Sequence, residues 1–200
     1  AGADIVATQA GTFRHSKPNK HWVESSQKRY MPVAEDSVVG IVTQRFGENF
    51  QVDILAARPA TLSGLAFEGA TRRNRPQLQV GALVYARVIS AHRDVDPEIA
   101  CVDANDKASG YGPLTGGFNF EVTTGMARAL LAHPTSPVLA ALGKHLAYEI
   151  AIGQNGRVWV DSGDVQTTIL VSNAITNARF LSGKQAEAMV EKLVQRILKG

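Results

Sequence analysis

The feature that most constrains the fold is a change in hydrophobic periodicity across a glycine-rich segment at residues 110–117. Before this segment, over residues 36–108, apolar residues alternate in short runs, which is typical of β-strands. After it, apolar residues also recur at the three- and four-residue spacing of helices. A chain of 200 residues can form two small domains. We therefore predict an α+β multidomain protein whose last domain spans 109–200, with a structured hinge at 110–117.

Residues 36–108 predict an all-β domain. Apolar alternation and intervening turn residues indicate strands at 38–43, 50–54, 62–67, 82–90 and 99–103. Five short strands fit a small closed barrel of the OB type, because closure removes exposed strand edges. Residues 1–35 contain short strand-like runs but too few apolar residues for a core, so we expect a partial N-terminal β element there.

Residues 109–200 predict an α/β domain. The expected elements are a strand at 118–122, helices near 126–131 and 137–146, a hairpin around 148–160, and two further helices. Asn155-Gly156 is a strong hairpin turn signal. Asp164 can cap a helix whose apolar stripe runs to Leu181, and residues 182–185 form a capping box for the last helix. The order β-α-α-β-β-α is that of a KH domain, with one additional helix.

The apolar face expected for the last helix is formed by Met189, Val190, Leu193, Val194, Ile197 and Leu198.

Composition argues against several classes of function. Net charge is +3 and the isoelectric point is about 9.1, which permits nucleic-acid binding without requiring it. The single cysteine, Cys101, excludes an intrachain disulfide, and the scattered histidines make a zinc site difficult to build. We find no P-loop or nucleophile elbow and therefore expect no catalytic site, metal or cofactor. No apolar window is long enough to span a membrane, and the acidic stretch at 94–106 is interpreted as solvated loop.

The run from Phe46 to Asp53 has an aromatic residue on each side of a turn, at the place where S1 barrels have a similar pattern. Alternation with Val52 favours a core position for Phe50. For Phe46, a core position and base stacking are both open, since aromatic residues at a barrel turn can stack on nucleic-acid bases. We include Phe46 and its neighbour Arg45 among the predicted RNA-binding residues.

The run from Phe67 to Pro76 is the most distinctive in the chain, because Arg72, Arg73 and Arg75 occupy three of four consecutive positions. Guanidinium groups in a loop between barrel strands can bind phosphates by forked hydrogen bonds. They can equally form salt bridges with an acidic partner protein. We favour either contact over simple solvation and predict these three arginines as RNA-binding residues.

Gly153-Gln154-Asn155-Gly156 matches the Gly-x-x-Gly loop by which KH domains hold a nucleic-acid backbone. That loop belongs between the first two helices, whereas this run lies in a strand–strand turn. The helix junction, residues 132–136, has no glycine. We therefore predict that Gly153, Asn155 and Gly156 have a structural, interdomain role and do not bind RNA.

Four segments together resemble the S1–KH cap subunits of the eukaryotic RNA exosome: residues 27–33, 39–43, 67–76 and 152–160. The resemblance implies an N-terminal domain, here represented by its last strands, followed by an S1 barrel and a KH domain. It also implies a non-catalytic subunit that sits with other cap subunits on a ring of RNase PH-like subunits.

By the same resemblance, such a subunit helps to form the entry pore for single-stranded RNA. The expected substrates are ribosomal RNA precursors, other non-coding RNAs and mRNA. The expected locations are the nucleus, nucleolus and cytoplasm. The alternative is a purely structural assembly subunit without direct RNA contact. An RNA-cleaving enzyme would require clustered acids or a histidine pair, which the sequence does not indicate.

Overall fold

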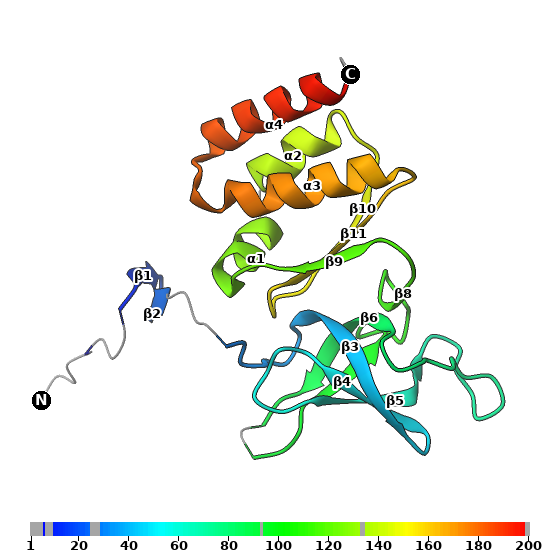
Figure 1. Cartoon of the computed structure of the whole chain (residues 1–200). Helices are drawn as coiled ribbons and strands as arrows, with labels where there is room; N and C mark the ends of the chain where they lie inside the picture. Colours follow the sequence, from blue (N-terminus) through cyan, green and yellow to red (C-terminus); the bar gives the residue numbers. More distant parts are fainter. Residues whose placement is uncertain (1–5, 7–9, 25–28, 93, 133–134, 199–200) are drawn as a thin grey trace, which may run out of the picture.

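The computed structural model describes residues 6, 10–24, 29–92, 94–132 and 135–198. In Figure 1 a β-barrel lies below an α/β domain, and the chain passes from the first to the second through β8 and β9. Near the N-terminus, β1 (Thr12–Ser16) and β2 (Lys20–Glu24) form an antiparallel hairpin. The predicted fold class, a barrel followed by a KH-type domain, is confirmed.

The barrel is closed by five strands: β3 (Ser37–Phe46), β4 (Asn49–Asp53), β5 (Ala60–Phe67), β6 (Leu83–Ser90) and β7 (Glu98–Cys101). β3 pairs with both β4 and β6, and β7 closes the barrel between β5 and β6. These correspond to the five strands expected from alternation, whose inward residues form one buried cluster. A further short strand, β8 (Gly112–Leu114), pairs with β6. Part of the predicted hinge therefore extends the barrel sheet.

The second domain has a three-stranded antiparallel sheet in the order β10-β11-β9. Its strands are β9 (Phe118–Glu121), β10 (Glu149–Ile152) and β11 (Arg157–Asp161). Its helices are α1 (Thr124–Leu131), α2 (Pro137–Gly143), α3 (Val165–Asn177) and α4 (Gly183–Leu198), with a 3-10 turn, η1 (Ala178–Phe180), between the last two. The helices gather on the side of the sheet away from the barrel (Figure 1). This is the predicted β-α-α-β-β-α order with an additional helix.

Two helix ends differ from the prediction. α2 ends at Gly143, where glycine disfavours helix continuation, so Leu146 lies beyond the helix although it still packs on the core. α3 tightens into η1 after Asn177, which turns Leu181 off the buried stripe and leaves it 37% exposed. The side chains of Ile197 and Leu198, expected on the apolar face of α4, lie outside the described residues.

The predicted helix starts rest on recognisable caps. The Asp164 carboxylate accepts a hydrogen bond from the Thr167 amide at 3.2 Å at the start of α3. At α4, Gln185 Oε1 accepts from the Ser182 amide at 3.0 Å, which is the returning half of a capping box. Satisfying these amides locally explains why the two helices begin where the sequence predicts.

The KH sheet is covered on both faces. Alternation points Val158 and Val160 toward the helices and Trp159 toward the barrel. Trp159 and Ala151 form a small buried cluster with Val39 of β3, and the Trp159 indole donates to the Gly116 carbonyl at 2.9 Å. The barrel and the KH domain therefore share a continuous apolar contact.

A carboxamide holds this contact in one register. Asn155, in the β10–β11 turn, is only 2% exposed. Its Nδ2 donates to the carbonyls of Val39 at 2.8 Å and Ile54 at 3.1 Å, and its Oδ1 accepts from the Val39 amide at 3.3 Å. A Cβ on Gly153 would lie 2.6 Å from the Val39 nitrogen, so only glycine permits this approach.

We expect Asn155→Ala to lower the free energy of unfolding by about 2–4 kcal/mol, because three buried backbone groups would lose their partner. Urea unfolding followed by tryptophan fluorescence measures this change. Gln154→Ala is the matched control, since the Gln154 backbone amide keeps its bond to the Ser37 carbonyl. Equal stability of the two variants would contradict the assigned role of the carboxamide.

Candidate nucleic-acid interface

A β-bulge decides which way the residues before the first barrel turn face. Val42 pairs with Val52, but Gln44 pairs with Gln51, so Thr43 is the extra residue. The following pair therefore places Arg45 opposite Phe50, on the inner face at the barrel end. Bulges commonly re-aim side chains at the rims of barrels, and this one reverses the simple alternation of β3.

The two aromatic residues of this turn have different environments. Phe50 is 3% exposed and packs in the barrel core, as predicted, and the Arg45 guanidinium lies 5.9 Å from its ring centroid. Phe46 pairs with Asn49 on the outer face and is 45% exposed. The structure thus resolves the two alternatives for Phe46 in favour of an accessible ring.

The predicted arginines lie in the loop between β5 and β6, residues 68–82. Thr71 and Asn74 exchange backbone hydrogen bonds of 2.9 and 3.1 Å, which form a tight turn that carries Arg72 and Arg73. Both of these arginines are exposed. Arg75 is different, because its Nη1 lies 2.7 Å from the Glu48 carboxylate in the β3–β4 turn.

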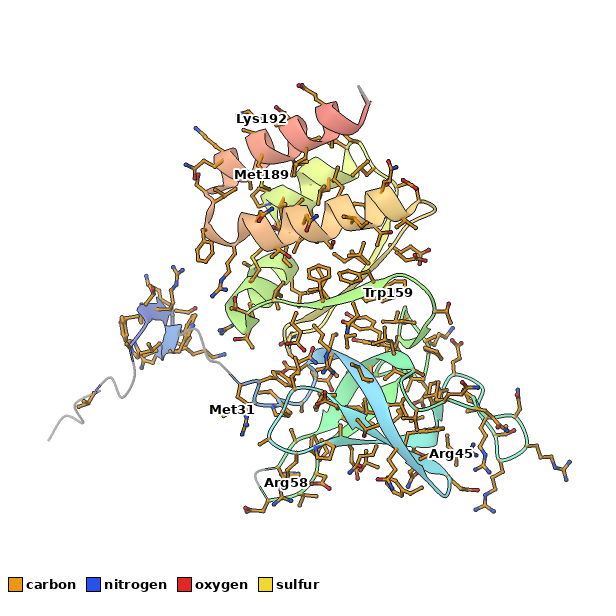
Figure 2. All side chains as sticks on the ribbon, in the orientation of Figure 1. Met31, Arg45, Arg58, Trp159, Met189 and Lys192 are labelled. Carbon is orange, nitrogen blue, oxygen red and sulfur yellow. The ribbon has the colours of Figure 1, made fainter. Side chains whose placement is uncertain are left out.

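The Arg75–Glu48 ion pair connects the arginine loop to the aromatic turn. Gly64 of β5 supports the same corner by donating its amide to the Glu48 carbonyl at 2.9 Å. The structure therefore brings Arg72 and Arg73 to the barrel end that carries Arg45 and Phe46. In Figure 2, Arg45 lies at this end and Arg58, from the β4–β5 loop, lies at the other.

Sequence analysis missed the polar outer face of β4 and β5. Cross-strand pairing places Asn49 beside Ser63 and Gln51 beside Thr61 on this face. These side chains are half-buried and can donate or accept hydrogen bonds. OB-type barrels bind oligonucleotides on the corresponding second and third strands. The polar residues that alternate with the apolar ones in these strands were the sequence signal for this face. Sequence analysis used only the apolar residues, to define the strands.

The β10–β11 turn is occupied by internal contacts. Gly156 has φ of +88°, and a Cβ there would lie 2.5 Å from the Val122 carbonyl. The Gln154 amide donates to the Ser37 carbonyl at 2.8 Å. The structure thus places Gly153 and Asn155 against the barrel and Gly156 against the segment after β9. The amides of Gly153 and Gly156 donate to the carbonyls of Arg157 and Gly153 within the turn, so they are not available to hold a phosphate. In the α1–α2 junction, His133 and Pro134 lie outside the described residues.

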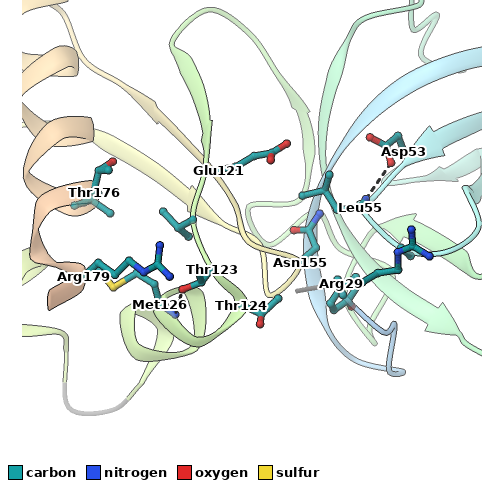
Figure 3. A pocket seen from close by; sticks show the side chains of 14 residues that line it. Arg29, Asp53, Leu55, Glu121, Thr123, Thr124, Met126, Asn155, Thr176 and Arg179 are labelled. Atoms are coloured by element: carbon teal, nitrogen blue, oxygen red, sulfur yellow. Dashed lines mark hydrogen bonds between the residues drawn. The ribbon is translucent and has the colours of Figure 1, made fainter. Parts of the chain in front are cut away.

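A cavity of about 770 Å³ lies between the two domains (Figure 3). Its charged lining residues are of both signs: Arg29, Arg179, Asp53 and Glu121. Asp53 is held by Arg157, whose guanidinium is buried and donates to the Asp53 carbonyl at 2.6 Å and to its carboxylate. The carboxylate is therefore engaged in the domain contact.

In the described part of the chain, no group of three or more His, Cys, Asp or Glu side chains could hold a metal ion. No helix among the described residues is both long and apolar enough to cross a membrane.

Comparison with known proteins agrees with this architecture. The family model for the S1 domain of exosome complex component RRP40 matches residues 30–112, and a KH domain model matches residues 117–166. Exosome complex component rrp40 of Schizosaccharomyces pombe is 41% identical, over 97% of this chain and 81% of its own length. The human RRP40 protein is 39% identical, over 97% of this chain and 73% of its own length.

The chain belongs to the exosome complex component RRP40 family. The resemblance indicated by the sequence motifs is therefore confirmed. RRP40 is a non-catalytic exosome cap subunit with S1 and KH RNA-binding domains. A solved structure of an exosome complex RNA-binding protein also shares the fold, with a TM-score of 0.69 and 22% identity over 85% of this chain and 99% of that one.

The Asp53–Arg157 contact predicts a specific pH dependence of stability. Burial alone would raise the pKa of the Asp53 carboxyl. Hydrogen bonds from Arg157 and from the Leu55 amide, together with the positive charge of Arg157, outweigh the effect of burial and hold the pKa below 3.8. The folded state then binds protons less readily than the unfolded state. The stabilisation is complete above about pH 4 and is lost as the pH falls toward the folded-state pKa.

We expect wild type to lose stability more steeply than Asp53→Asn as the pH falls below about 4, measured by urea unfolding at each pH. Asp53→Asn is the less stable protein at pH 7, and the difference narrows in acid. Asp96→Asn is the control, because the ion pair that Asp96 forms with Arg58 is exposed. Parallel stability curves for wild type and Asp53→Asn would refute the prediction.

Proposed function

We propose that this RRP40-family subunit contacts single-stranded RNA at the barrel end formed by Arg45, Phe46, Arg72 and Arg73. The observation that carries the proposal is the 2.7 Å ion pair between Arg75 and Glu48, because it joins the arginine loop to the aromatic turn. An exposed ring and two exposed guanidinium groups then lie at one barrel end, beside a polar strand face. Aromatic stacking and backbone-tracking cations are the usual means of binding single strands.

Each group has a distinct task in this proposal. Phe46 stacks on a base, and Arg72 and Arg73 bind phosphates. Gln51 and Thr61 hydrogen-bond to bases or sugars on the outer face of the barrel. Arg75 positions the loop and does not meet RNA directly, since its guanidinium is paired with Glu48. The KH domain orients the barrel, because its turn is committed to the domain contact.

We further propose that the subunit docks, with other cap subunits, on a ring of RNase PH-like subunits at the RNA entry pore. Support comes from the relatives, which are named as exosome complex components. The proposed substrates follow from the family resemblance and are ribosomal RNA precursors, other non-coding RNAs and mRNA. The proposed locations are the nucleus, nucleolus and cytoplasm.

The competing function is a purely structural assembly subunit. One observation favours it: Arg75, Asn155 and Arg157 all serve contacts within the chain. In that case Arg72 and Arg73 would contact an acidic protein neighbour. Charge reversal in the arginine loop would therefore remove RNA contact under the first function and assembly under the second.

We expect the double variant Arg72→Glu/Arg73→Glu to lose RNA crosslinking in the assembled complex while assembly is retained. The log–log salt slope of RNA binding should fall by about 1.4, the value for two phosphate contacts on a single strand. Arg58→Glu is the matched control, an exposed arginine at the opposite barrel end. Lost assembly with unchanged RNA contact would favour the structural function.

Phe46→Ala is expected to weaken RNA binding by about 1–3 kcal/mol without changing the salt slope, because stacking involves no ion release. Fluorescence anisotropy with a labelled oligouridine at several salt concentrations measures both quantities. The melting temperature should not change, since the ring is exposed. Phe50→Ala provides the contrast, with a loss of about 3–5 kcal/mol of stability. Unchanged affinity in Phe46→Ala would remove the stacking contact from the proposal.

A further inference from the structure

The last helix, α4, has four rows of residues at four-residue spacing, and three of them lie side by side on and beside its buried face. The middle row, Ala186, Val190 and Val194, is buried against the KH core. The row on one side includes the exposed acids Glu187 and Glu191. The row on the other side is Gln185, Met189 and Leu193, with no acid. The acidic and apolar flanks of α4 are therefore separated by the buried row.

The apolar flank borders a groove of about 500 Å³. Its lining residues are Leu181, Gln185, Ala188, Met189, Lys192 and Leu193. Among the described residues of this lining, Lys192 is the one that carries a charge, and it is exposed. Phe180, which precedes Leu181 in the chain, is 84% exposed. The groove thus has a floor of aliphatic and thioether side chains that is open at the surface beside a cation.

Domain packing explains this surface only in part. Met189 and Leu193 pack on the KH core but remain half-buried, and Leu181 is turned outward by η1 and is exposed. Contiguous exposed apolar side chains commonly mark protein contacts, and methionine suits such contacts because it adapts to different partners. Figure 2 shows Met189 and Lys192 on α4, remote from the barrel. The groove is therefore separate from the proposed RNA surface.

We propose that this groove binds an amphipathic helix of a partner protein, with apolar anchors on Leu181, Met189 and Leu193 and an acidic side chain against Lys192. A helix laid in a groove presents anchors at spacings of three, four and seven residues, which suits a floor lined along α4. Lys192 is a cation, and the described lining residues include no acid, so the groove selects an acidic partner over a basic one. Nucleic acid fits the floor less well, because the lining residues that the structure describes include no aromatic ring for base stacking.

The test uses the full chain and a designed peptide helix with leucine at the anchor spacing and glutamate on the polar face. A second peptide has lysine in place of glutamate, and an oligouridine is the third probe. Selective methyl labelling of methionine leaves three reporters, Met31, Met126 and Met189. The acidic peptide is expected to shift the Met189 signal and to leave those of Met31 and Met126 in place.

Lys192→Glu is expected to weaken binding of the acidic peptide by about fivefold in fluorescence anisotropy. Lys184→Glu, the same charge reversal at an exposed position of α4 outside the groove lining, should bind as wild type does. Leu181→Gln should weaken binding while the melting temperature is unchanged, since Leu181 is exposed and lines the groove. The proposal is overturned if both peptides bind equally, if Lys192→Glu and Lys184→Glu bind alike, or if oligouridine shifts Met189 and the acidic peptide does not.

Discussion

The hydrogen bonds of the Asn155 carboxamide are the constraint on which the rest of this structure depends. A single side chain meets the amide and carbonyl of Val39 and the carbonyl of Ile54, at a point where none of them is accessible to water. Buried backbone groups need partners, so this turn can dock in only one register. Gly153 allows the approach, and the Arg157–Asp53 ion pair adds a charged contact next to it. The relative orientation of the barrel and the KH domain follows from these few atoms.

The same hydrogen bonds also determine which of the two domains can present a surface to RNA. A KH domain that uses its glycine-containing turn to bind a barrel cannot use the same amides to hold a nucleic-acid backbone. The surface suited to RNA is instead the barrel end, where the Thr43 bulge turns Phe46 outward and the Arg75–Glu48 ion pair brings the arginine loop alongside. The two irregularities, a bulge and a loop contact, are small, but they gather side chains that are about thirty positions apart in sequence.

Sequence patterns predicted most of the elements because local chemistry specifies them. Alternation identified the five barrel strands, and Asp164 and Gln185 marked helix starts through bonds to nearby amides. The errors occurred where the local signal was ambiguous. α2 stopped one turn before Leu146, and Leu181 left the stripe of α3, since apolar spacing alone does not show where a helix tightens or ends. β8 was assigned to a hinge because three residues of glycine-rich chain form a strand only when β6 is there to pair with them.

By itself, the sequence determined which residues are apolar, where turns and caps can form, and which family the chain resembles, because these depend on neighbours within a few positions and on recognisable runs. Only the tertiary structure decided that Phe46 is exposed, that Arg75 is paired while Arg72 and Arg73 are exposed, and that Asn155 joins the domains. Each of these outcomes depends on a partner in another strand or loop. Burial and pairing depend on contact between two segments that are distant in sequence, so the sequence of either segment alone does not predict them.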